Sequence, residues 1–336
     1  MAAQSLEPRR AVIWILIAIV VALLLPFISS GFVLRLATIA GLLAIAAIGL
    51  NILMGFTGQI SLVQAGLYGV GAYVSAILTR NQGFPVWPSI FIGAFSAGIF
   101  AIGIGLIAFR TKGVYFIISS LAAQLVASEV FINWAPVTGG EQGIARIPAP
   151  EGLAIPGLIT LSFADRVNYY HLVLTCLAAV LFLAYRLRAS SLGRLFFAVR
   201  EDETLARSMG VNVTLVKSVS FFIAAAVAGF AGALYAHYES FINPDSFTWL
   251  GSADLFIFVL LGGSGTTLGP IVGTFLLYPL PEILRVAAQF RLIVYALILL
   301  AVAILMPKGI IGTLSTGKAE APSILGRKRG PPQPPR

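Results

Sequence analysis

Apolar runs of about 20 residues recur along almost the whole sequence. The chain has 336 residues, of which 58% are hydrophobic and only 10% are charged; soluble domains carry about 25% charged residues. An apolar run of this length crosses a bilayer as a helix, in which every backbone polar group is satisfied within the segment. The sequence therefore predicts an all-α polytopic membrane protein with about 8–10 transmembrane helices, some of them broken by glycine.

The apolar runs also divide the chain. Residues 1–10 form a polar N-terminus, residues 11–312 a transmembrane domain, and residues 313–336 a basic, Pro-rich tail whose composition is typical of disorder. We expect both ends in the cytoplasm. The expected spans are about 11–28, 36–54, 60–78, 87–109, 114–134, 169–185 and 218–238, then a broken segment at 252–280 and a last span at 292–306.

Positive charge indicates how the chain is oriented. The segment 186–217 holds six Lys and Arg residues and three acidic residues, whereas the long loop 135–168 has a net charge of −1 (two Arg against three acids). Short loops rich in Lys and Arg stay on the cytoplasmic side. We therefore expect 186–217 in the cytoplasm and 135–168 outside. The remaining excess of positive charge favours anionic lipid as a partner rather than nucleic acid.

A short amphipathic helix is expected within the cytoplasmic loop, over Glu203–Gly210. Leu205 and Met209 are four residues apart and share one face, while Glu203 and Arg207 share another. Gly210 then offers a helix stop. Two interpretations stay open at this point: a surface that docks a soluble partner, or a solvated loop that its charge holds near lipid.

Glycine interrupts two of the expected spans, at Gly55–Gly58 and at Gly262–Pro270. The basic tail returns to the cytoplasm only if the segment 252–280 enters the membrane and comes back. Paired interruptions in the two halves of a chain indicate a transport site. Glycine has another predicted role in the run 218–238, where Gly229 and Gly232 allow a neighbouring helix to approach closely.

Residues at the two breaks are the candidates for a solute pathway. Half-helix N-termini suit a carboxylate, and unwound carbonyls suit an ammonium group. The alternative is that the neutral side chains only bond freed backbone groups inside the bundle. The candidates are Gly55, Gly58, Gln59, Ser61, Gln64, Gln124, Gly262, Gly263, Ser264, Gly265, Thr266 and Thr267.

Catalytic, metal and nucleotide sites find little support. The single cysteine, Cys176, excludes an internal disulfide and a Cys-based metal site, and His171 and His237 are far apart in the sequence. The stretch GTLSTGK at 312–318 begins like a phosphate-binding loop, but Ala319 stands where Ser or Thr is required. We therefore expect no catalytic residue, no metal site and no cofactor bound by this chain.

Five stretches carry a resemblance to a known family. They read IGLNILMGFTGQISLVQAGLYGVGAY (48–73), TGGEQGIARIP (138–148), SLGRLFFAVREDETLARSMGVNVTLVKSVSFFIAAAVAGFAGALYA (191–236), GGSGTTLGPIVG (262–273) and PKGIIG (307–312). They closely resemble the branched-chain amino acid permeases of ABC transporters, of the LivM type. The likeness covers about residues 36–312. It departs from the family at Gln64, where the family usually has His.

The resemblance implies the following assembly in the bacterial inner membrane. A pair of homologous permease subunits would work with two cytoplasmic ATPase subunits, which bind and hydrolyse ATP, and with a periplasmic solute-binding protein. The cytoplasmic loop would be the coupling loop that an ATPase holds. Thr204 and Leu205 depart from the EAA pattern of such loops, while Gly210 matches it. The implied coupling residues are Glu203, Leu205, Ala206, Arg207, Met209 and Gly210.

Alternatives to this function remain open from the sequence. Importers of urea, amides and other small solutes share these motifs. An ion-coupled secondary carrier is a second alternative, although the spans lack the set of intramembrane acids that a proton relay needs. A membrane scaffold is a third, but a scaffold has no use for broken spans.

Overall fold

The computed structural model describes residues 30–111, 113–155 and 159–283, with short pieces at 26, 296–297, 300–301, 304, 306 and 309–311. The N-terminus (1–10), nearly all of the expected first span (11–28) and the tail (313–336) lie outside the described residues, as does most of the last span (292–306). Predictions for these segments stay predictions, and so does the total of about 8–10 spans.

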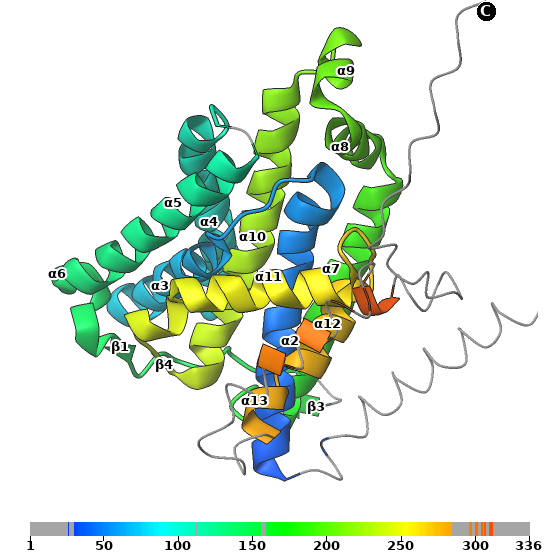
Figure 1. Ribbon diagram of the computed structural model, residues 1–336. Coiled ribbons are helices and arrows are strands. Elements are labelled where there is room, and N and C mark those ends of the chain that lie inside the picture. Colours follow the sequence, from blue (N-terminus) through cyan, green and yellow to red (C-terminus); the bar gives the residue numbers. More distant parts are fainter. Residues whose placement is uncertain are drawn as a thin grey trace, which may run out of the picture.

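The described part is a bundle of helices (Figure 1). The long elements are α2 (Gly31–Asn51), α3 (Gln64–Gln82), α4 (Val86–Ala108), α5 (Val114–Asn133), α7 (Arg166–Ala189), α10 (Val213–Glu239), α11 (Trp249–Gly263) and α12 (Gly269–Leu277). The short ones are a π-helical turn η1 (Ile52–Phe56), α6 (Ala135–Thr138), η2 (Gly140–Gln142), α8 (Ser191–Glu201), α9 (Glu203–Ser208), η3 (Pro244–Phe247) and α13 (Leu280–Ile283).

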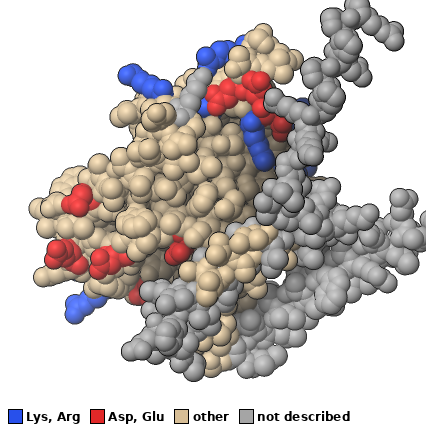
Figure 2. All heavy atoms as spheres, in the orientation of Figure 1, with Lys and Arg blue, Asp and Glu red and all other residues tan. Residues whose placement is uncertain are grey.

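Six described helical segments are long and apolar enough to cross a membrane: Gly31–Phe56, Val86–Ala108, Val114–Asn133, Arg166–Ala189, Val213–Glu239 and Pro244–Gly263. Five of them match expected spans, and the sixth, Pro244–Gly263, overlaps the first part of the expected broken segment 252–280. The prediction of an all-α polytopic membrane protein is confirmed. Figure 2 shows a broad uncharged band between charged residues at the two ends of the molecule, as a membrane-embedded surface requires. The expected span at 60–78 forms α3, which packs inside the bundle against α4 and α10.

Close helix contacts in the centre of the bundle depend on glycine. A Cβ atom at Gly232 would lie 1.9 Å from the carbonyl oxygen of Tyr68, and one at Gly71 would lie 2.1 Å from that of Gly229. The backbones of α3 and α10 are therefore in direct contact, and the prediction for Gly229 and Gly232 is confirmed. Without water-driven association in lipid, such tight packing is a main source of helix–helix stability.

Short strands mark one end of the bundle. β1 (Ile144–Ala145) pairs antiparallel with β4 (Phe241–Ile242), and β2 (Leu153–Ile155) pairs with β3 (Ile159–Leu161). The pairing of β1 with β4 puts the loop 135–168 at the same end as the segment that follows α10. Arg35 at the start of α2 also reaches this end, where it forms an ion pair of 3.0 Å with Glu239. The helices α8 and α9 lie at the opposite end (Figure 1).

Both predicted glycine breaks are confirmed. The first follows η1, where Gly58 has a φ of +72° and the chain stays irregular until Gln64. The second separates α11 from α12, and Gly263 and Gly265 there have φ values of +123° and +79°, which favour glycine. The helices α11 and α12 pack against each other, so the chain reverses at the second break.

Candidate coupling and translocation site

The two glycine breaks meet in the structure. Asn51, at the end of α2, accepts a hydrogen bond from the backbone N–H of Gly265 (2.8 Å) and donates one to the carbonyl of Thr266 (2.8 Å). A Cβ atom at Gly55 would lie only 2.5 Å from the nitrogen of Gly265. The backbones of the two breaks are therefore in contact, and the amide of Asn51 holds them together.

Arg200, in the last turn of α8, reaches the same point. Its guanidinium donates to the carbonyl of Gly55, and a Cβ atom at Gly265 would lie 2.8 Å from its Nη1 atom. Its side chain also covers Gly58, where a Cβ atom would lie 3.2 Å from the Cγ atom of Arg200. A hydrogen bond from a charged donor is about twice as strong as a neutral one.

The second break is bonded on its other sides as well. Thr266 closes the turn itself, because its hydroxyl donates to the carbonyl of Gly263 (2.7 Å) and accepts from the N–H of Gly269 (3.0 Å). The guanidinium of Arg188, at the end of α7, donates to the hydroxyl of Thr267 (3.4 Å). A Cβ atom at Gly309 would lie 2.5 Å from the Cα atom of Gly263. Four of the stretches that carry the family resemblance thus converge here.

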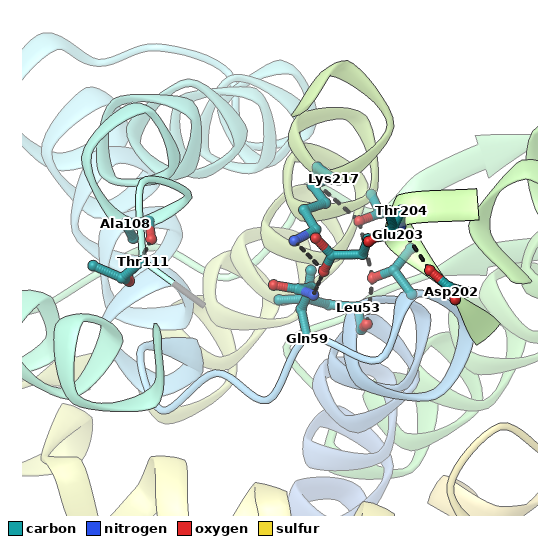
Figure 3. Close-up of polar contacts among 10 residues, drawn as sticks. Leu53, Gln59, Ala108, Thr111, Asp202, Glu203, Thr204 and Lys217 are labelled. Carbon is teal, nitrogen blue, oxygen red and sulfur yellow. Dashed lines mark hydrogen bonds and ion pairs between the residues drawn. The ribbon is translucent and has the colours of Figure 1, made fainter. Parts of the chain in front are cut away.

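The first residue of α9, Glu203, is bonded to α10 and to the first break. Glu203 forms an ion pair of 2.5 Å with Lys217 of α10, and the amide of Gln59, from the first break, lies 3.5 Å from the same carboxylate oxygen (Figure 3). Asp202 caps the helix, accepting from the backbone N–H groups of Thr204 (2.7 Å) and Leu205 (3.0 Å). Such caps favour a helix N-terminus by satisfying free donors.

The predicted coupling helix is confirmed as a helix, and its faces differ in exposure. Leu205 is 60% and Met209 77% exposed, whereas Ala206 is buried against the bundle. Arg207 is also exposed, and Gly210 ends the helix with a φ of +84°. An apolar pair is thus presented to the surroundings at the end of the molecule where Lys and Arg gather in Figure 2.

Three predicted pathway residues bond groups outside the contact between the two breaks. Gln64 is fully buried and donates to the carbonyls of Ala46 and Ala224 (3.2 Å each). Ser61 is buried too, and its hydroxyl accepts from its neighbour Val63 (3.4 Å). These side chains join helices or stabilise the local turn.

Gln124 is the most fully bonded of these side chains. It accepts from the N–H of Gly66 (2.6 Å) and the hydroxyl of Ser252 (3.1 Å), and it donates to the carbonyl of Phe247 (2.8 Å). It therefore connects α3, α5, η3 and α11. The remaining predicted residues, Gly262 and Ser264, belong to the end of α11 and to the turn after it; Gly262 packs on the carbonyl of Gly269.

A small hollow adjoins the first break. A shallow pocket of about 220 Å³ lies beside Gly58 and Gln59, against the start of α5. A larger cavity of about 600 Å³ lies at the opposite end of the bundle, beside the pair Arg35–Glu239, and holds none of the predicted pathway residues. Within the described ranges, no group of three or more His, Cys, Asp and Glu side chains gathers as metal ligands would.

The sequence was compared with known proteins. A profile of the family described as "Branched-chain amino acid transport system / permease component" matches residues 32–306. The chain belongs to this family. It is 32% identical to the high-affinity branched-chain amino acid transport system permease protein LivM of Escherichia coli K12 over 310 residues, which cover 87% of this chain and 73% of LivM. No solved structure matches the chain.

Other relatives differ in what their names say they carry. The permease LivH of Escherichia coli K12 is 26% identical over 82% of this chain and 92% of its own length. The autoinducer 2 import system permease protein LsrC of Yersinia pseudotuberculosis is 26% identical over 78% of this chain and 73% of its own length. The family confirms the resemblance seen in the motifs. The chain is therefore a permease component of a multi-subunit ABC importer, not an enzyme.

Sequence reasoning did not identify Asn51 or Arg200. Asn51 is 214 residues from Gly265 in the chain, and Arg200 is 145 residues from Gly55. Asn51 offered one signal, since it is a polar residue in an apolar run about one turn before a glycine break. Arg200 offered none, because it is one of several basic residues in the charged loop.

Proposed function

We propose that this permease subunit imports branched-chain amino acids across the bacterial inner membrane, by alternating access driven by partner ATPases. The complete importer would contain a second, homologous permease subunit, two cytoplasmic ATPase subunits and a periplasmic solute-binding protein. ATP is bound and hydrolysed by the ATPases. In this arrangement the end with α8 and α9, the N-terminus and the tail face the cytoplasm, and the end with β1 and β4 faces the binding protein.

The proposed docking of α9 to an ATPase rests on one observation: α9 is held rigidly and exposes two apolar side chains. This six-residue helix is capped by Asp202 and tied to the bundle by Glu203, yet it presents Leu205 and Met209 outward. An isolated helix of this length is unstable in water, so the cap and the ion pair hold in place a surface whose two large apolar side chains are exposed. A groove on a soluble ATPase, which receives apolar residues at helical spacing, matches this geometry.

The solute assignment rests on the relatives. LivM, at 32% identity, and LivH are named for branched-chain amino acids, whereas LsrC, named for autoinducer 2, is 26% identical. Urea, amides and other small solutes remain the competing substrates. Uptake of radiolabelled leucine, measured in the presence of each competing solute, distinguishes them. The true substrate should inhibit leucine uptake at a lower concentration than the other solutes do.

Purification from native membranes tests the assembly. Two ATPase subunits and a sister permease should co-purify with this chain, and their identities follow from mass spectrometry. A chain that purifies alone and moves leucine in liposomes without ATP would instead be a secondary carrier.

Substitution of the exposed apolar pair tests the docking role. The double variant Leu205→Asp/Met209→Asp should insert normally into the membrane and should lose ATP-dependent leucine uptake by more than about tenfold, the scale expected when charges replace the centre of an interface. Thr204→Asp is the matched control, since it adds a charge to the first turn of the same helix, where the helix dipole favours it. Normal uptake by the double variant would overturn the assignment of α9 as the docking helix.

A further inference from the structure

Arg200 stands between the docking helix and both glycine breaks. It lies two residues before Asp202, which caps α9, and its guanidinium donates to the carbonyl of Gly55 in the first break. The same guanidinium packs on Gly265 of the second break. A movement of α9 therefore acts on Arg200 through a single peptide segment, and Arg200 acts on both breaks.

Asn51 makes the two breaks move together. Its side-chain oxygen and nitrogen bond the second break at Gly265 and Thr266, while its own helix continues directly into the π-helical turn that contains Gly55. Asn51 is almost fully buried, so water cannot replace these two bonds. Single-turn π-helical segments inside α-helices are frequent at functional sites, and here the turn supplies the carbonyl that Arg200 binds.

Glu203 provides a second connection in parallel. Through Lys217 and Gln59 it joins the first residue of α9 to α10 and to the loop after the first break. The docking helix is thus attached to the breaks at its N-terminal end by two charged groups, Arg200 and Glu203. Of the residues of α9 after Glu203, only Ala206 is buried.

The bond of Arg200 differs in kind from the bonds of Asn51. Arg200 is exposed overall, so its guanidinium can exchange the Gly55 carbonyl for water at small net cost. The buried amide of Asn51 cannot exchange its two bonds for bonds to water. One contact can therefore open and close while the other persists, as a switch coupled to a rigid element requires.

We propose that Arg200 acts as a latch, a contact that opens and closes, and that Asn51 is a rigid connection between the two breaks. Together they transmit movement of the ATPases from α9 to the two glycine breaks, which shift as one body. This inference rests on the docking role proposed above for α9. Neither residue touches solute in it; both are positioning residues. Loss of the latch should separate ATP hydrolysis from transport, because the ATPases still dock while the breaks no longer follow α9.

Hydrogen exchange on the purified complete importer tests the latch itself. Arg200→Ala should speed amide exchange in the segments 52–59 and 262–268 by about tenfold, within the range of about 5- to 150-fold typical of coupled sites. Arg200→Lys should restore part of the protection, since Lys keeps a charged donor but lacks the planar fork. Arg194→Ala is the matched control: Arg194 lies on the same helix and bonds locally, to the hydroxyl of Ser191 and the carbonyl of Ala189.

Leucine taken up per ATP hydrolysed, in liposomes that contain the importer, tests the transmission. Arg200→Ala should lower this ratio about tenfold while ATP hydrolysis continues, and Arg194→Ala should leave it unchanged. Asn51→Leu should lower the ratio and expose both breaks to exchange at once. Unchanged exchange in Arg200→Ala, or an equal fall in uptake and hydrolysis, would contradict the proposal. If the wild-type importer moves no leucine, the solute assignment fails, and hydrogen exchange still decides the latch.

Discussion

Lys217 and Glu203 form an ion pair of 2.5 Å at the junction between α9 and α10. The Lys217 side chain is only 5% exposed, and that of Glu203 is 28% exposed. A buried charge is costly unless its partner is in place. The pair therefore fixes the position of α9 relative to α10, which runs through the centre of the bundle (Figure 1).

Removal of one partner should destabilise this junction. Glu203→Gln leaves Lys217 buried without a counter-charge, which costs about 3 kcal/mol, and it should also lower ATP-dependent uptake. The matched control is Glu201→Gln, because Glu201 is an exposed acid two residues earlier. Thermal unfolding of both variants in detergent measures the difference. Equal melting temperatures for Glu203→Gln and wild type would show that the pair adds no stability.

The cap of α9 should contribute separately. Asp202→Ala removes the acceptor of two backbone N–H groups, and loss of such a cap costs about 1 kcal/mol of helix stability. Asp202→Asn should keep most of it, since the Asn side-chain oxygen accepts the same bonds. Amide exchange of the segment 203–209 measures the effect. Faster exchange in both variants alike would mean that the charge matters rather than the cap.

Replacement of glycine by alanine should disturb helix packing at one site and be tolerated at another. Gly232→Ala places a methyl group 1.9 Å from the Tyr68 carbonyl, so α3 and α10 must separate, at a cost of about 3 kcal/mol or more. Gly103→Ala, in α4, meets no atom within 4 Å and should be neutral or stabilise by up to about 1 kcal/mol. The yield of folded protein and the melting temperature should therefore fall in Gly232→Ala and stay level or rise in Gly103→Ala. A similar loss in both variants would refute the packing argument.

Gln124 should behave as a structural residue. Gln124→Leu leaves the Gly66 N–H without its side-chain acceptor, at a cost of about 1–3 kcal/mol for an unsatisfied buried group, and leaves the Phe247 carbonyl only the longer bond from the Ser128 hydroxyl (3.4 Å) among its side-chain bonds. Folded protein should therefore decrease, while the folded fraction should select among leucine, isoleucine and valine as the wild type does. Uptake competition among these solutes, normalised to folded protein, provides the measurement. A changed order of preference at normal yield would return Gln124 to the solute pathway.

Local chemistry made many features of the fold predictable. Apolar runs of sufficient length predicted five of the six described segments that are long and apolar enough to cross a membrane. Glycine predicted the breaks after Gly55 and Gly262, and the spacing of Leu205 and Met209 before Gly210 predicted the helix α9. Each of these features depends on residues within one or two turns of each other, so a single segment carries the whole signal.

The candidate site was only partly predictable, for the same reason. Gln64 and Gln124 are neutral hydrogen-bonding residues of the kind expected in a solute pathway. In the structure, however, their amides bond backbone groups of neighbouring helices. Asn51 and Arg200 have no local signal that separates them from other polar residues nearby. Which polar group meets which backbone group is decided by how distant helices pack, because a hydrogen bond forms only at about 3 Å.

The sequence by itself determined the class of protein, the positions of its spans and breaks, and the family to which it belongs. The tertiary structure alone decided that the two breaks, 214 residues apart at Asn51 and Gly265, form one unit beside α8 and α9. The physical reason is that hydrophobic length and glycine content act within a segment, whereas contact between breaks requires α2, α8 and α11 to be brought together by the packing of the entire bundle.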